Sequence, residues 1–301
     1  MRGRETEPPP RDVSGARRGG RRRSVASLVP SRLPARLLGG GQNAARDLLV
    51  VAVTLLGLGR LVDASVAPVL ALLLGLAVML GTRATLRADD PDAQATVPPE
   101  AGLVAGVLAA TLLLAARFVP LSWGFGAALV ASAVVLFVAV LAERRAVVHA
   151  ADASPRLPLL TVSVIAAFIG FTAVAGLVDG ALGTGPGALT EAGLLALAAA
   201  DALIAGLLTY RLGRIEPAPP RVAVIGVFTS GLVVALAAGL LRAVAVPTAL
   251  WPAILTVVFF LWDAVRSSSV AIRRDPRWIW QFGLLAVLSA VVVVWNLGLR
   301  R

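Results

Sequence analysis

Long apolar segments recur along the chain and constrain its fold more than any other feature. Seven segments of 17 to 22 residues carry few charges, and each is long enough to cross a bilayer as a helix. They are 101–119, 121–142, 159–178, 192–210, 222–241, 249–265 and 278–298. An eighth stretch, 48–81, would measure about 51 Å as one helix, well beyond a hydrocarbon core of roughly 30 Å. We therefore expect two helices there, over 48–62 and 66–81, and about nine spans in all.

Composition agrees with an all-α, polytopic transmembrane helix bundle. Of the 301 residues, 58% are hydrophobic and only 15% are charged, which is outside the range of ordinary soluble domains. The chain has no cysteine, and all of its 28 basic residues are arginine, so thiolate metal sites, disulfides and lysine Schiff bases are excluded. The single histidine, His149, cannot build a multi-histidine metal site. We predict no catalytic residues, metal or cofactor, and the sequence favours a non-enzyme.

The first 46 residues differ sharply from the rest and form a tail ahead of a transmembrane domain over 47–301. The tail holds 11 arginines against Glu5, Glu7 and Asp12, and it is rich in Pro, Gly and Ser. Such a composition cannot build a core, so we expect a disordered cytoplasmic tail. Most of the net charge of +11 lies there, which argues against a nucleic-acid partner. The cluster 17–23 could bind anionic lipid headgroups at roughly 1 kcal/mol per arginine, or it could serve only as an orientation signal.

The distribution of arginine along the chain predicts the topology. If 48–81 forms two helices, the tail and the four arginine-rich loops all lie on one side of the membrane. These loops are 82–100, 143–158, 211–221 and 266–277. Because arginine-rich loops are cytoplasmic, the amino terminus should be cytoplasmic and the carboxyl terminus extracytoplasmic. The arginine-only bias further suggests a bacterial cytoplasmic (inner) membrane, with the lipid bilayer as the expected partner.

A short motif recurs where four helices should leave the membrane on the outer side. The copies are RLVD at 60–63, RFVP at 117–120, GLVD at 176–179 and RAVA at 242–245. We therefore expect four helical hairpins and a closing ninth helix. Three copies carry an arginine, which makes Arg60, Arg117 and Arg242 a candidate outer anion site for a group such as a lipid phosphate. The alternative is that each arginine simply reaches the nearest headgroups.

One acid lies in the middle of an apolar segment. Asp201, within ALAAADALIAG at 196–206, is near the expected bilayer centre. Burial there costs roughly 2.5 to 3.5 kcal/mol, so the side chain should face other helices. Hydroxyls at similar depth make a candidate midplane polar site with it: Thr229, Ser230, Thr256 and Ser132. The alternative is that Asp201 only joins helices. A second acid, Asp263, should pair with Arg266 three residues later.

These features favour three functions in order. The first is a carrier or channel for a small solute or ion, with Asp201 as the coupling or substrate-binding residue. The second is a non-catalytic membrane scaffold or assembly subunit. The third is an enzyme acting on a lipid-linked phosphate, for which the outer arginines could bind substrate although no acid–base pair accompanies them. The substrate and the oligomeric state do not follow from the sequence.

Overall fold

The computed structural model describes residues 41–89, 97–148, 156–178, 191–215, 219–243 and 246–268. Within these ranges every regular element is helical. The predicted closing span 278–298 and residues 1–40 of the tail lie outside the described residues. The first helix begins at Gly41, so the boundary predicted at residue 46 falls inside it.

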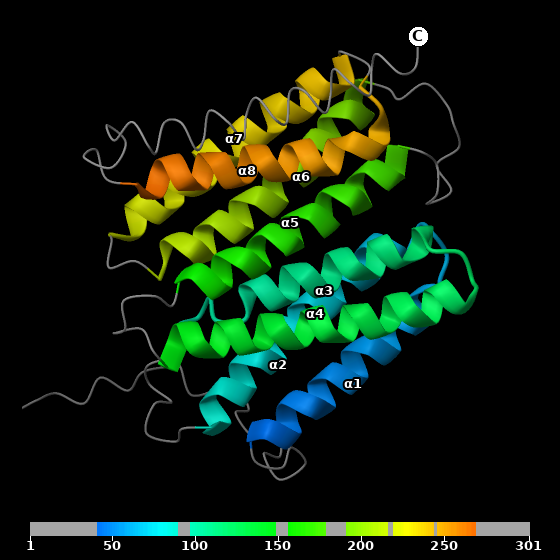
Figure 1. Ribbon diagram of the computed structural model, residues 1–301, viewed down its shortest axis with the longest axis vertical. Coiled ribbons are helices and arrows are strands. Elements are labelled where there is room, and N and C mark those ends of the chain that lie inside the picture. Colours follow the sequence, from blue (N-terminus) through cyan, green and yellow to red (C-terminus); the bar gives the residue numbers. More distant parts are fainter. Residues whose placement is uncertain are drawn as a thin grey trace, which may run out of the picture. The chain divides into compact units, whose positions relative to one another are not determined.

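The described residues form eight α-helices, seen in chain order from blue to orange in Figure 1. They are α1 Gly41–Gly59, α2 Ala67–Asp89, α3 Leu103–Ala115, α4 Trp123–Val148, α5 Arg156–Val178, α6 Glu191–Gly213, α7 Pro220–Ala243 and α8 Trp251–Ser267. Two short 3-10 helices, Ala116–Phe118 and Thr248–Leu250, follow α3 and precede α8. The gap between α1 and α2 confirms that 48–81 forms two helices.

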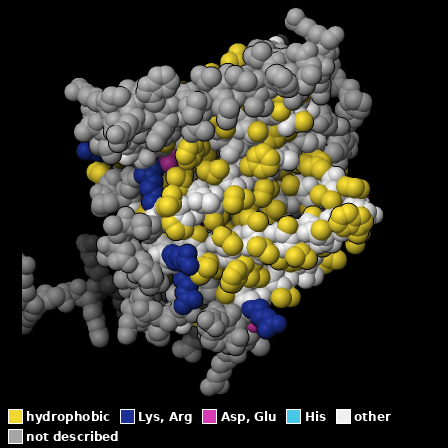
Figure 2. Space-filling view, viewed as in Figure 1, with side chains coloured by type: hydrophobic (Ala, Val, Ile, Leu, Met, Phe, Trp, Pro, Cys, Tyr) yellow, Lys and Arg dark blue, Asp and Glu magenta, His cyan; other side chains and the backbone are white. Residues whose placement is uncertain are grey.

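Six helices in the described part of the chain are long and apolar enough to cross a membrane. They are α2, α4, α5, α6, α7 and α8 together with the 3-10 turn before it. Leu103–Phe118 is a shorter apolar helix, and α1 has polar and charged residues in its first turns. Large apolar side chains cover the outside of these helices, and one broad apolar face is visible in Figure 2. The described part of the chain is therefore all-helical, and the length and composition of its helices are those of a multi-pass membrane protein.

The helices pack in two sets of four with the same neighbour pattern. In α1–α4 each helix contacts the next, α1 also contacts α4, and the broadest contact joins α2 to α3. In α5–α8 each helix contacts the next, α5 contacts α8, and the broadest contact joins α6 to α7. The sets meet mainly through α3 and α5 (Figure 1). Because the broadest contacts join helices of different expected hairpins, the two-helix hairpin does not stand out as the packing unit.

Small residues let the central helices of each set approach closely. A Cβ added to Gly106 of α3 would lie 2.6 Å from the carbonyl oxygen of Gly75 in α2. A Cβ added to Gly231 of α7 would lie 3.2 Å from the carbonyl oxygen of Ala202 in α6. Such contacts are typical of helix pairs in membranes. Since α2 corresponds to α6 and α3 to α7, Gly75 is matched by Ala202 and Gly106 by Gly231.

This match extends to the functional candidates. Gly106 and Gly231 each precede an arginine by eleven residues, namely Arg117 and Arg242. The residue before Ala202 is Asp201, whereas the residue before Gly75 is Leu74, a buried side chain of the core. The acid is thus present in one four-helix set and replaced by an apolar side chain in the other.

Candidate functional site

Asp201 lies on the interior face of α6, as predicted. Leu197, Ala205 and Leu208 are buried on the same helix at one-turn or two-turn spacing from it, and Asp201 itself is 1% exposed. Its Oδ2 accepts a hydrogen bond from Nη2 of Arg242 in α7 over 3.0 Å. The partner of the buried acid is therefore an arginine.

The direction of side chains on helices explains how these two residues meet. On an α-helix the Cα–Cβ bond tilts toward the amino terminus. Asp201 therefore leans toward the start of α6, and Arg242 leans back from the end of α7 toward its start. Because the two consecutive helices are antiparallel, as Figure 1 shows, the side chains lean toward each other. The guanidinium, on its long stem, reaches the acid although Arg242 is the penultimate residue of its helix.

Trp251, the first residue of α8, holds the guanidinium from another side. The Cζ atom of Arg242 lies 5.2 Å from the centroid of the indole ring, within cation–π distance. The ring is itself fixed, because its Nε1 donates to the carbonyl oxygen of Val246 over 2.9 Å and the residue belongs to a small buried apolar cluster with Ala175. The site thus combines an acid from α6, an arginine from α7 and an aromatic ring from α8.

The ion pair leaves polar atoms without partners. Asp201 is 1% exposed and the Arg242 side chain 7%, yet Oδ1 of the acid and both Nε and Nη1 of the arginine are buried with no hydrogen bond. Buried polar atoms are almost always paired, because leaving one unpaired costs about 1 to 3 kcal/mol and more for charged groups. The contact is a single hydrogen bond between two groups that can form several.

A second buried ion pair in the same bundle leaves no buried side-chain nitrogen or oxygen of either residue unpaired. Nε and Nη2 of Arg211 in α6 both donate to Oε2 of Glu143 in α4, over 2.9 and 2.7 Å. The other carboxylate oxygen accepts the backbone N–H of Val104 over 3.2 Å, at the first turn of α3. A carboxylate at a helix amino terminus also interacts favourably with the helix dipole. This pair, 2% and 0% exposed, joins three helices and has the geometry of a structural joint.

Further ion pairs lie near the same ends of the helices as Glu143. Arg214 pairs with Glu100 over 2.9 Å, linking the end of α6 to the turn before α3. Asp263 pairs with Arg266 over 3.1 Å, as predicted, and also with Arg156 at the start of α5 over 2.8 Å. These contacts fix the helix ends on the side where the arginine-rich loops begin.

None of the four predicted hydroxyls forms a hydrogen bond with Asp201. The hydroxyls of Thr229, Thr256 and Ser132 donate to carbonyl oxygens one turn earlier on their own helices. Ser230 accepts a hydrogen bond from Thr209 of α6 over 2.9 Å, which joins α6 to α7. A serine or threonine hydroxyl in a helix can hydrogen-bond to the backbone of its own helix in this way, so similar depth did not imply a hydrogen bond to Asp201.

The three predicted outer arginines divide into a pair and a single residue. Nη1 of Arg117 donates to the carbonyl oxygens of Gly59 and Val62 over 3.0 and 2.8 Å. Nη1 of Arg60 donates in turn to the carbonyl oxygen of Arg117. Each arginine thus satisfies carbonyl groups at the end of the other's helix, a common use of cations near helix carboxyl termini. Arg242 instead pairs with Asp201.

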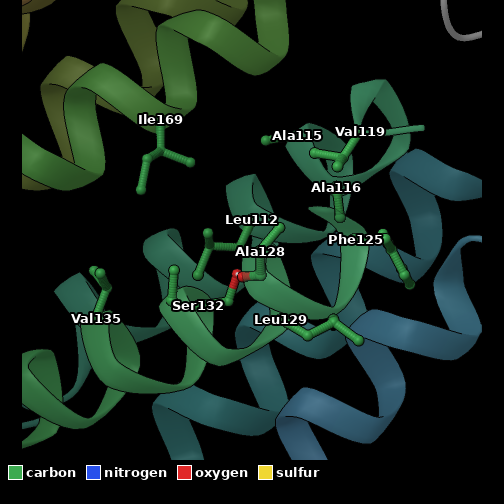
Figure 3. A pocket seen from close by; sticks show the side chains of 11 residues that line it. Leu112, Ala115, Ala116, Val119, Phe125, Ala128, Leu129, Ser132, Val135 and Ile169 are labelled. Atoms are coloured by element: carbon green, nitrogen blue, oxygen red, sulfur yellow. The ribbon is translucent and has the colours of Figure 1, made fainter. Parts of the chain in front are cut away.

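A cavity lies elsewhere in the bundle, between α3, α4 and α5. It has a volume of about 220 Å³, and Figure 3 shows apolar side chains such as Leu112, Leu129 and Ile169 around it. Ser132 contributes the one side-chain oxygen in this wall, and its hydroxyl already bonds to the backbone of α4. The cavity therefore offers apolar surface and no free polar group to a ligand.

Sequence reasoning missed Glu143, Arg211 and Trp251. Glu143 precedes two arginines, 144 and 145, at a helix end, so its charge suggested an exposed loop. The signal that was available is the opposite sign of Glu143 and Arg211, which both lie near the carboxyl ends of helices that run in the same direction. The chain matches no family model, no curated protein and no solved structure. The site must therefore be interpreted from its own geometry.

Proposed function

We propose that this protein is a carrier for a small charged solute, and that the Asp201–Arg242 pair is its working part. A carrier needs a polar site within the bundle that can exchange partners as the helices move. A buried ion pair held by one hydrogen bond, with three polar atoms unpaired, fits that need. The unpaired atoms are the observation that carries the proposal.

Comparison with the Glu143–Arg211 pair supports a working role. Both pairs are buried and both join α6 to another helix, so burial alone does not distinguish them. The difference lies in hydrogen bonding, because neither residue of the first pair has a buried unpaired side-chain atom, whereas both residues of the second pair do. A complete network favours rigidity, whereas an incomplete one is costly unless another group uses the free atoms.

Comparison of the two four-helix sets supports the same interpretation. Leu74 occupies the position in α2 that Asp201 occupies in α6, and it packs in the core. The helix pair therefore does not need an acid for its packing. An acid retained at a cost in only one of the sets is expected to serve binding or coupling rather than helix association.

The proposed membrane arrangement has nine spans, including 278–298. We infer an amino terminus and arginine-rich loops in the cytoplasm, a carboxyl terminus outside and residence in a bacterial inner membrane. The four hairpins and closing helix remain a proposal for how the chain inserts. Arginines at the ends of α2, α4, α6 and α8 support this orientation.

Cysteine accessibility tests the carrier proposal, because the natural chain has no cysteine. Ala205 is fully buried one turn from Asp201, and Ala139 of α4 is equally buried. In sealed vesicles a small water-soluble thiosulfonate should label Ala205→Cys, because a carrier must admit water to its site, and should spare Ala139→Cys. Equal protection of both cysteines from both sides would contradict a carrier and favour the scaffold.

A further inference from the structure

We infer that Arg242 is the binding site for a small oxyanion, a carboxylate or phosphate group, and that Asp201 occupies it when no anion is bound. The inference rests on the proposed function and names the substrate class of the same site. The guanidinium of Arg242 has three nitrogen donors. Of the three nitrogens, only Nη2 has a partner, Oδ2 of Asp201, while Nε and Nη1 are buried and unpaired.

The geometry of a guanidinium shows what could use those donors. Its N–H groups form two forks, Nε with Nη2 and Nη1 with Nη2, and each fork matches two oxygens of a carboxylate or phosphate. Asp201 contacts only Nη2, the nitrogen that both forks share, and leaves its own Oδ1 unpaired. An incoming oxyanion that engages a whole fork gains a hydrogen bond that Asp201 does not make.

The surroundings favour an oxyanion bound in a fixed place. The indole of Trp251 lies 5.2 Å from Cζ of Arg242 and restricts the positions open to the guanidinium. Arginine stacked on an aromatic ring keeps its fork oriented, so less freedom is lost when an anion binds. Glu143 and Arg211 provide the internal contrast, because there one carboxylate oxygen already takes a whole fork.

Charge makes Asp201 a competitor of the anion. When an oxyanion takes the guanidinium, the carboxylate of Asp201 loses its counter-charge and repels the ligand at close range. Removing that charge should therefore strengthen anion binding. We expect the apparent Kd for the anion to fall at least about tenfold, given the size of a charge–charge interaction near a protein interior.

Thermal unfolding of the full-length, detergent-purified protein tests this inference, with sodium phosphate and sodium acetate as probes against sodium chloride at equal ionic strength. Either probe should raise the Tm of the natural protein, because a ligand that binds only the folded state stabilises it. In Asp201→Asn the apparent Kd for the probe should fall at least about tenfold. In the double variant Asp201→Leu/Arg242→Leu, which keeps an apolar core, the response should vanish.

Two control variants show whether the response to the probes comes from Arg242 or from other charged residues. Glu143→Gln removes the acid of the Glu143–Arg211 pair, and its Tm should respond to the probes no more than that of the natural protein. Arg60→Gln removes an outer arginine that bonds to backbone, and it should keep the natural response. If Asp201→Asn binds the probes no better than the natural protein, or if the double-leucine variant still responds, the inference is overturned.

A lipid headgroup carries the same phosphate chemistry, so nanodiscs provide a second arm. Stabilisation by free phosphate in nanodiscs of uncharged phosphatidylcholine would assign the site to a soluble anion. Stabilisation only by phosphatidylglycerol, lost in the double-leucine variant, would assign it to a lipid phosphate. If neither phosphate nor phosphatidylglycerol stabilises the protein while Ala205→Cys is labelled, the anion site is overturned and the carrier proposal stands. If an anion binds but Ala205→Cys is not labelled, the carrier proposal is overturned.

Discussion

A single residue decides how this bundle is interpreted, because Asp201 is a buried acid with an incomplete set of partners. Its carboxylate faces Arg242 over 3.0 Å, and each of them keeps unpaired buried atoms. If only hydroxyls surrounded Asp201, an amide could replace the acid at little cost in stability. With Arg242 as the partner the cost is larger, since losing one charge of a buried pair leaves the other uncompensated.

We therefore predict that Asp201→Asn destabilises the protein by about 2 to 4 kcal/mol, because Arg242 is left buried without a counter-charge. Glu143→Gln should cost at least as much, since it also disturbs the cap on Val104. Chemical or thermal unfolding in a mild detergent measures both variants. An Asp201→Asn protein as stable as the natural one would mean that the ion pair contributes nothing to the folded state.

The sequence predicted the burial of Asp201 but not its partner. Burial follows from the cost of exposing an acid to lipid, which depends only on the position along the helix. The partner depends on where the end of a long side chain lies. The prediction compared residues by the depth of their backbone in the membrane, which does not show how far an arginine side chain reaches. Arg242 is near the end of α7, and its stem carries the guanidinium back to Asp201. By contrast, Asp263 and Arg266 are three residues apart on one helix, so their pairing was predictable.

At the scale of elements, the two central helix pairs are variations on one packing arrangement. Close approach at Gly75 and Gly106 joins α2 to α3, and close approach at Ala202 and Gly231 joins α6 to α7. The recurrence of short motifs predicted a repeat of two helices, whereas the contacts between helices follow one pattern that recurs over four helices. Helix neighbours are not ordered by sequence alone, so the four-helix pattern needed the structure.

The correspondence between Leu74 and Asp201 predicts the effect of a double replacement. Asp201→Leu alone should destabilise the protein, because it strands the charge of Arg242. Asp201→Leu/Arg242→Leu should recover most of that loss, since a well-packed apolar pair often equals or exceeds a buried ion pair in stability. Comparison of the three Tm values checks this. If the double variant is less stable than the single one, the ion pair is structurally required and the correspondence with α2 is wrong.

The close spacing of α2 and α3 gives an independent prediction for that helix pair. In Gly106→Ala the new Cβ would lie 2.6 Å from a backbone oxygen of α2, so the helices must separate. We expect a loss of about 1 to 3 kcal/mol, as for other overpacked sites. Gly239→Ala in α7 is the matched control, because a Cβ there meets nothing within 4 Å. Its unfolding free energy should stay equal or rise slightly, and equal losses in both variants would refute close packing as the cause.

At the scale of the whole molecule, orientation follows from arginine and from the number of spans. An impermeant maleimide applied to intact cells should label Gly185→Cys in the predicted outer loop. It should miss Ala151→Cys in a predicted cytoplasmic loop. The reverse pattern would invert the topology, and labelling of both positions would contradict the number of spans.

The central claim is that the Asp201–Arg242 pair, rather than the fold around it, opens the bundle interior to water and solute. The most direct measurement is thiosulfonate labelling of Ala205→Cys in two backgrounds, the natural sequence and the double variant Asp201→Leu/Arg242→Leu. Both backgrounds should be folded, as their Tm values would show. A working ion pair predicts labelling in the natural background and protection in the double-leucine background. Equal labelling in both, or protection in both, would contradict the claim.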